Sequence, residues 1–248
     1  MTGEPSAASC SAWSSQSGQS VQSGQSGQSS YQRDGHVVVP GVLDGADVAA
    51  CLEHLERLRA GRPTGSSIVA VVPGCDPFLD GMAADPRLYG LASGLMGGEV
   101  TCFGCTYMLK DGQDGPAALW HQDGYPWQDQ LGIATAVTLW IALDDVDVHN
   151  GALQVIPGSH WLPAQPLRAV EGEAGGMFGA GMDEVMVASL FGVSGRPGEA
   201  AEGGTGEPAG LGGPAGPSAL GSESVRVIRM AAGDVSAHHS RLVHGSGA

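Results

Sequence analysis

A histidine and a carboxylate stand two positions apart in the stretch WHQDG, which runs from Trp120 to Gly124. On a β-strand, side chains two positions apart point to the same face, so His121 and Asp123 could reach one point in a cavity. Two histidines and one carboxylate can bind a mononuclear Fe(II) ion from one side and leave other positions open for chemistry. Alone the pair is a weak signal, because such pairs are more often hydrogen-bonded than metal ligands.

A third ligand must come from a strand distant in the sequence, and five histidines follow the pair. His244 ends an apolar run and precedes Gly245, which permits close approach of another group, so we favour it as the third ligand. We interpret His149 and His160 as surface or turn residues. For the neighbouring His238 and His239 we expect packing or hydrogen bonding rather than a ligand role.

The composition favours one acidic, intracellular domain. The chain has 248 residues, enough for one well-buried core, and 11 Lys and Arg against 26 Asp and Glu give a formal charge of −15. Lys110 is the single lysine, so we expect no nucleic-acid partner and no anionic membrane surface. Five cysteines indicate reduced thiols. We expect Cys102 and Cys105 to point to opposite faces of a strand and not to form a zinc pair.

Two segments have biased compositions that predict disorder. Residues 1–30 are rich in Ser, Gln and Gly and predict a flexible tail, and residues 194–224 are rich in Gly, Pro and Ala and predict an insertion. The domain therefore covers residues 31–248. Its apolar runs are shorter than the roughly 18 residues of a membrane span, and the start does not read as a signal peptide. We expect the protein to be located in the cytoplasm, and the peroxisome or another organelle stays open as an alternative.

Most ordered segments have the period of β-strands. Apolar residues at helical spacing predict one helix over residues 48–58, capped by Asp44 or Asp47, and a second over residues 85–96. The pair Asn150-Gly151 predicts a turn and a hairpin. Strands are expected at residues 36–40, 100–109, 134–143, 152–156, 225–230 and 235–243. Short strands with helices gathered at the front predict a mainly β fold, a small barrel or jelly roll with N-terminal helices.

Four segments together resemble one enzyme family. They read YQRDGHVVVPGVLDGADV, WHQDGYPW, LWIALDDVDVHNGALQVIPGSHW and AGDVSAHHSRLVHGSG, in this order along the chain. In wording, order and spacing the sequence is similar to the phytanoyl-CoA dioxygenase family of Fe(II)- and 2-oxoglutarate-dependent oxygenases. The likeness covers nearly all of residues 31–161 and resumes at residue 225. Four segments in register are far more specific than the His-Asp pair alone.

This resemblance implies a fold and a set of site residues. The fold is a double-stranded β-helix, the jelly roll of cupin-like proteins. His121, Asp123 and His244 bind Fe(II); Trp140 lines the 2-oxoglutarate pocket, Ser246 places a hydroxyl near this cosubstrate, and Thr106 lies on a strand that borders the pocket.

The resemblance also implies a reaction. With O2, 2-oxoglutarate is converted to succinate and CO2 while a small or lipid-like organic substrate is hydroxylated, and ascorbate is a further candidate cofactor. Asp123 favours hydroxylation, because a small residue there would free a position for halide. An acyl-CoA substrate is less favoured, because few basic residues are available for its phosphates. The sequence carries no pattern that predicts the oligomeric state.

One departure from the family concerns the far carboxylate of 2-oxoglutarate. The family places an arginine roughly ten residues beyond the distal histidine, where it pairs with this carboxylate, whereas the chain ends at Ala248. We therefore expect a C-terminally truncated form with no substitute for the arginine, since Lys110 lies at a different place from the lysine of some members. Two alternatives stay open: a catalytically inactive or fragmentary member, and a cupin-type metal-binding protein with other chemistry.

Overall fold

The computed structural model describes residues 21–60, 67–110, 115–133, 135–170, 177–193, 195–197 and 225–247. Most of the predicted insertion at 194–224 and the first twenty residues of the predicted tail lie outside these ranges. Among the described residues, no helix combines the length and the apolar character that a membrane crossing requires.

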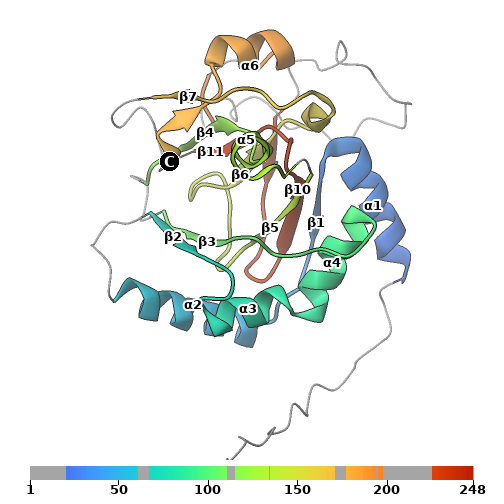
Figure 1. The fold of residues 1–248 in the computed structure, drawn as a ribbon, viewed down its shortest axis with the longest axis vertical. Helices are drawn as coiled ribbons and strands as arrows, with labels where there is room; N and C mark the ends of the chain where they lie inside the picture. Colours follow the sequence, from blue (N-terminus) through green and yellow to red (C-terminus); the bar gives the residue numbers. More distant parts are fainter. Residues whose placement is uncertain are drawn as a thin grey trace, which may run out of the picture.

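Two antiparallel sheets form the centre of the fold (Figure 1). The three-stranded sheet has the order β1-β10-β5, and the four-stranded sheet has the order β4-β11-β6-β9. Two smaller sheets pair β2 with β3 and β7 with β8. The bounds are β1 His36–Val39, β2 Ile68–Val71, β3 Cys105–Met108, β4 Ala118–His121, β5 Val137–Ile141, β6 Leu153–Val155, β7 Arg168–Ala169, β8 Ala180–Gly181, β9 Arg226–Ile228, β10 Val235–His239 and β11 His244–Ser246. The predicted mainly β architecture with N-terminal helices is confirmed, and the sheets are antiparallel.

Within the described ranges, four helices precede β3, and two more lie within the β region. In Figure 1, α1 lies beside β1 and α4 lies next to α1, whereas α6 lies at the far end of the fold, near β4 and β7. The bounds are α1 Val21–Asp34, α2 Gly45–Arg59, α3 Pro77–Ala83, α4 Pro86–Met96, α5 Gly124–Leu131 and α6 Glu184–Phe191, with a short 3-10 helix at Ser159–Trp161. Residues 21–30, the last part of the expected flexible tail, belong to α1 in the structure.

The local signals for the two predicted helices are confirmed. Asp44 caps α2 by accepting the backbone N–H groups of Ala46 and Asp47, while the Asp47 carboxylate accepts the N–H of Asp44 in return. Such a reciprocal cap contributes about 1 kcal/mol. Helix α4 ends at Gly97, whose φ of +74° is a conformation that glycine adopts without strain.

Three strand predictions were wrong in their extent or partner. Residues 235–243 do not form one strand: a turn at Ser240 and Arg241 divides them, so that β10 and β11 belong to different sheets. The expected hairpin at Asn150-Gly151 is absent among the described pairings, because β5 and β6 also belong to different sheets. In the expected strand at 100–109, only Cys105–Met108 pairs, with β2.

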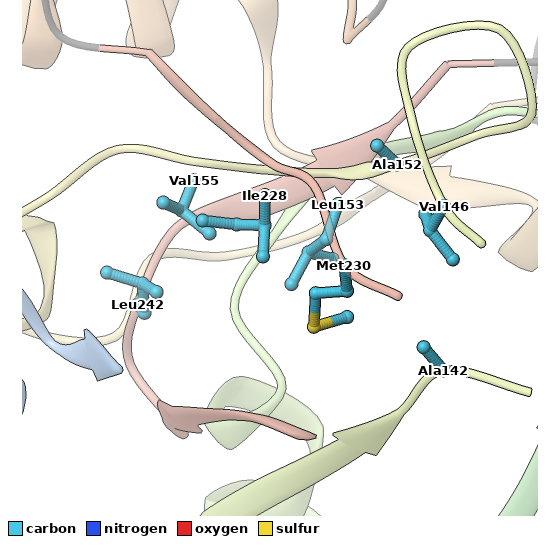
Figure 2. Close-up of a cluster of buried hydrophobic side chains, with 8 residues drawn as sticks. All are labelled: Ala142, Val146, Ala152, Leu153, Val155, Ile228, Met230 and Leu242. Atoms are coloured by element: carbon cyan, nitrogen blue, oxygen red, sulfur yellow. The ribbon is translucent and has the colours of Figure 1, made fainter. Parts of the chain in front are cut away.

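An apolar cluster fills the space between the two large sheets. In Figure 2, Leu153, Ile228 and Met230 point toward the strand end that carries Ala142. The cluster consists of Ala142, Val146, Ala152, Leu153, Val155, Ile228, Met230 and Leu242. A second cluster, Trp120, Ile156, Met182, Val187, Phe191, Val193 and Val243, packs α6 against the outer face of β4 and β11. Burial of each large side chain in these clusters contributes about 1.5–3 kcal/mol.

Candidate metal centre

Alternation along β4 and β11 turns two histidines toward the interior of the fold. Trp120 and Val243 belong to the outer cluster under α6, so the residues that follow them, His121 and His244, point to the opposite face. The two histidines are partners in the antiparallel register of β4 and β11. Their ring centroids lie 4.1 Å apart, and both rings are buried.

Asp123 reaches the same point from outside the strand. β4 ends at His121, and Asp123 has φ −55° and ψ −36° at the start of α5, so the expectation that both share a strand face was wrong. Gly124 donates its N–H to Ser240 O over 2.6 Å, and a Cβ at Gly124 would lie 3.0 Å from that oxygen. The glycine that ends WHQDG thus permits the start of α5 to pack against the turn between β10 and β11.

Three ligand atoms converge on one point. His121 Nε2 lies 3.5 Å and His244 Nε2 lies 3.6 Å from Asp123 Oδ1. Over the part of the chain that the structure describes, this is the single group of three His, Cys, Asp or Glu side chains whose ligand atoms all lie within 4.8 Å of one another. The donor set of two imidazoles and one carboxylate suits a non-haem Fe(II) ion. The structure therefore brings together the three residues that the sequence singled out.

Backbone hydrogen bonds set the tautomer of both histidines. His121 Nδ1 lies 2.7 Å from Leu119 O, and His244 Nδ1 lies 2.9 Å from Leu242 O. A carbonyl oxygen only accepts, so each Nδ1 carries the hydrogen and donates it. Each Nε2 then presents its lone pair to the point shared with Asp123. This is the usual way in which a protein orients a histidine toward a metal ion.

Two further side chains hold the other oxygen of Asp123. Thr138 on β5 donates its hydroxyl hydrogen to Asp123 Oδ2 over 2.8 Å, and His238 Nε2 on β10 lies 3.3 Å from the same oxygen. Because a carboxylate accepts, His238 uses Nε2 as a donor and has no lone pair there for a metal ion. Oδ1 remains for a ligand role. The expected hydrogen-bonding role of His238 is confirmed.

Burial and neighbouring groups favour the protonation states that a metal ion needs. Burial, followed by the neighbouring His121, lowers the pKa of His244 to about 3. Burial acts to raise the pKa of Asp123, but the neighbouring histidines His244, His121 and His238 outweigh it and hold that pKa well below the usual value. At neutral pH the centre therefore contains a neutral His244 and an ionised carboxylate.

The three residues predicted to contact the cosubstrate lie in different parts of the structure. Ser246 is buried on β11, two residues after His244. Trp140 on β5 packs against the cluster between the sheets, two residues after Thr138 and thus on the same strand face. Thr106 lies on β3, in the small sheet with β2, and its side chain is exposed.

Sequence reasoning missed the position of Lys110. Its ammonium group donates to Ser246 Oγ over 2.9 Å and to the carbonyl oxygen of Gly247. The sequence indicated only that Lys110 lies at a different place from the lysine of some family members, whereas in the structure the chain after β3 carries this side chain to the end of β11. A lone lysine next to a strand gave no periodic signal for such a contact.

Two other expectations were wrong in position. His160 is buried rather than superficial, because its ring packs against His239 with centroids 5.4 Å apart. Cys102 and Cys105 do not point to opposite faces, since their Sγ atoms lie 3.7 Å apart. Residues 100–104 are not a strand, so the alternation that would separate the thiols does not apply. His149 is exposed in a turn, as expected.

Phe178 is a further residue near the centre that no sequence pattern indicated. Its ring centroid lies 5.1 Å from that of His121, and the side chain is 40% exposed. An aromatic side chain between solvent and a metal ligand can contact a substrate or exclude water.

Comparison with known protein families and with curated proteins finds relatives that are named as dioxygenases or hydroxylases. The sequence model described as phytanoyl-CoA dioxygenase matches residues 31–248. The chain is 39% identical to an L-proline trans-4-hydroxylase from Streptomyces griseoviridis over 141 residues, which are 52% of each protein. It is 30% identical to an ectoine dioxygenase from Bordetella parapertussis over 146 residues, which are 53% of this chain and 47% of the relative. The chain thus spans about half the length of the curated relatives it matches.

Solved structures share the fold. The non-heme alpha ketoglutarate dependent epimerase SnoN from nogalamycin biosynthesis has a TM-score of 0.59 and 25% identity, covering 91% of this chain and 77% of SnoN. EctD from S. alaskensis has a TM-score of 0.63 and 20% identity, covering 96% of this chain and 74% of EctD. Structures of these two proteins contain Fe3+ with alpha ketoglutarate and 2-oxoglutarate with 5-hydroxyectoine, respectively. With a sequence match that runs from residue 31 to residue 248, the chain belongs to the phytanoyl-CoA dioxygenase family.

Proposed function

We propose that the chain is a non-haem Fe(II)- and 2-oxoglutarate-dependent dioxygenase that hydroxylates a small organic substrate and releases succinate and CO2. One observation carries the proposal: His121 Nε2, His244 Nε2 and Asp123 Oδ1 converge, with both histidines in the tautomer that a metal ligand requires. The two large sheets are the halves of the double-stranded β-helix that this chemistry uses.

The protein's part in this chemistry is to hold the ligands and to limit access. His121, Asp123 and His244 would hold the ion on one side, and Thr138 and His238 keep Asp123 Oδ2 engaged so that Oδ1 stays available. Bound Fe(II) supplies the activation of O2 that couples decarboxylation of 2-oxoglutarate to oxidation of a C–H bond. Phe178 shields the outer side of His121. Trp140 and Ser246 border the cosubstrate pocket, and Thr106 contributes from its rim.

The substrate that fits best is a small molecule of the amino-acid size class. Two relatives are named for L-proline and ectoine, which are compact and carry no phosphate. A formal charge of −15 with a single lysine disfavours a phosphate-rich acyl-CoA. The other reactants are 2-oxoglutarate and O2, and Fe(II) is the cofactor.

Anaerobic spectroscopy tests the proposed function directly. We expect the protein with Fe(II) to develop the weak visible charge-transfer band of a chelated 2-oxo acid when 2-oxoglutarate is added. His121→Ala should abolish both the band and tight Fe(II) binding, whereas His149→Ala, which removes an exposed histidine from a turn, should leave both unchanged. Fe(II) binding with no response to 2-oxoglutarate would favour a cupin-type protein instead. Equal Fe(II) binding by His121→Ala would contradict the ligand set.

A further inference from the structure

We propose that Cys102 and Cys105 form a reversible disulfide when a peroxide oxidises them, and that this disulfide changes the contact of Phe103 with Trp127 on α5. The two thiols lie outside the candidate metal centre, so their oxidation does not depend on the proposed function. Only the expected effect on Fe(II) binding rests on that function, because it assumes that Asp123 is a metal ligand.

The two sulfur atoms are already close, and one of them lies on a segment outside the sheets. Cys102 Sγ and Cys105 Sγ are 3.7 Å apart, and a disulfide requires ~2.05 Å. Cys105 is held at the start of β3 by its pairing with Val71. Residues 100–104 belong to no helix or strand, so Cys102 can make the closing movement without breaking a strand pair.

A cavity beside both thiols gives room for this movement. Its volume is about 290 Å³, and Cys102 and Cys105 are part of its lining. Most of the other walls are apolar side chains, among them Val71 on β2 and Leu79 on α3. A small neutral oxidant such as hydrogen peroxide, which is little larger than water, has room to enter such a space.

The two thiols differ in exposure, which gives them different roles in the oxidation. Cys102 is exposed, whereas Cys105 is half-buried. Burial, followed by the neighbouring Cys102, raises the pKa of Cys105 to about 12. Because the thiolate is the attacking form and reactive cysteines are accessible, Cys102 reacts first and Cys105 second.

The oxidation consumes one peroxide for each disulfide. The Cys102 sulfur attacks one oxygen of hydrogen peroxide, the O–O bond breaks, and water leaves, so that Cys102 becomes a sulfenic acid. The Cys105 sulfur then attacks the Cys102 sulfur, the S–O bond breaks, and the hydroxyl group leaves with the Cys105 proton as a second water. The two thiols thus lose two electrons in total, and the peroxide gains them.

A structural zinc ion is a weaker explanation for the thiol pair. Such a site needs four ligands. Within the described ranges, the single group of three His, Cys, Asp or Glu side chains with converging ligand atoms is the one at His121, Asp123 and His244. Since no third ligand of these types joins the two sulfur atoms there, redox chemistry fits the pair better.

Phe103 links the thiol pair to the helix that begins at the metal centre. It lies between the two cysteines in the sequence, and its ring meets that of Trp127 edge-on, with centroids 4.9 Å apart and planes at 84°. Trp127 lies in the first turn of α5, directly after Asp123. Closing the disulfide tightens the chain around Phe103, and we expect its ring to move away from Trp127 as a result.

Mass spectrometry tests the disulfide. Metal-free protein is treated with hydrogen peroxide, alkylated and digested with pepsin. We expect the peptide that contains both Cys102 and Cys105 to lack two hydrogens and to carry no alkyl group, and dithiothreitol to restore both thiols. Cys102→Ser should abolish this product, whereas Cys75→Ser, which removes another exposed cysteine, should leave it unchanged. Separate sulfinic or sulfonic acids, or a disulfide to Cys75 instead, would overturn the proposal.

Two measurements on the oxidised protein, after removal of the peroxide, test the effect on α5. Tryptophan emission, taken as the difference between native and Trp127→Phe protein, should change on oxidation and return with dithiothreitol; an unchanged difference would refute the link through Phe103. Anaerobic titration should show Fe(II) binding about 3- to 10-fold more weakly to the oxidised form, and Phe103→Leu should reduce this ratio. If neither form binds Fe(II), the proposed function fails, whereas the mass and emission results still decide on the disulfide.

Discussion

Thr138 donates its hydroxyl hydrogen to Asp123 Oδ2 over 2.8 Å and thereby joins β5 of one sheet to the start of α5 beside the other. With His238 on the same oxygen, this bond fixes the carboxylate so that Oδ1 faces His121 and His244. A ligand oriented in advance binds an ion more tightly than a free one, because less rotational freedom is lost.

Replacement of Thr138 by valine tests this orientation. Valine keeps the β-branched shape and removes the donor, so we expect Fe(II) to bind about 10-fold more weakly with little change in melting temperature. The measurement is an anaerobic Fe(II) titration, with Thr101→Val, at an exposed position, as the matched control. An unchanged dissociation constant for Thr138→Val would show that the remaining contacts suffice to orient Asp123.

Replacement of His238 distinguishes a supporting residue from a ligand. Because Nε2 of His238 donates to Asp123 and cannot also bind an ion, we expect His238→Phe to retain one Fe(II) per chain at reduced affinity. His244→Ala should lose stoichiometric binding altogether. Metal analysis after gel filtration gives the stoichiometry, and nitric oxide added to the Fe(II) form gives a spectroscopic signature. Loss of the ion in both variants would place His238 among the ligands.

The sequence indicated which residues meet at the centre better than how the chain brings them there. His121, Asp123 and His244 could be named because their types and the four family segments are local features of the chain. The turn at Ser240 and Arg241 could not, since residues 235–243 contain no glycine or proline that would mark it. The contact between Lys110 and Ser246 spans most of the domain and depends on how the sheets meet, which no local pattern records.

Helix positions were predicted most accurately. Asp44 and Gly97 mark their helix ends by hydrogen bonding and by backbone conformation within a few residues, so neighbouring sequence suffices. Residues 21–30 form part of a helix in spite of their Ser, Gln and Gly content, because α1 packs along β1 and α4. Tertiary packing of this kind overrides local propensity.

The buried histidines behind β10 predict acid sensitivity. Burial, then the charge of Arg226, lowers the pKa of His36 to about 4, and burial followed by His160 lowers that of His239 to about 4. In the unfolded chain these histidines bind protons near pH 6.5, whereas in the folded protein they bind them only near pH 4. The stability that comes from keeping these two histidines neutral is therefore fully present above pH 6.5 and is lost as the pH falls toward 4.

Urea unfolding at pH 7 and pH 5 measures this loss. We expect the free energy of unfolding to fall by about 1–3 kcal/mol over this interval, and His36→Gln to reduce the fall. His149→Gln, at an exposed turn, should leave it unchanged. If His36→Gln and the native protein lose equal stability, the source of the acid sensitivity lies elsewhere.

The last prediction concerns the glycine of WHQDG. Gly124 has a φ that other residues tolerate, so the reason for glycine is space: a Cβ would lie 3.0 Å from Ser240 O and 3.1 Å from Ser240 Cβ. Gly124→Ala should push the start of α5 away from the turn between β10 and β11, at a cost of about 1–3 kcal/mol in unfolding free energy. Because Asp123 precedes Gly124, the Fe(II) affinity should fall as well.

Gly45→Ala provides the matched control. Gly45 also lies in the first turn of a helix, but a Cβ there would meet nothing within 4 Å, so this change should be neutral or slightly stabilising. Thermal unfolding and Fe(II) titration of both variants separate the two effects. Reduced stability with native Fe(II) affinity in Gly124→Ala would mean that the contact with Ser240 supports the fold but does not position Asp123.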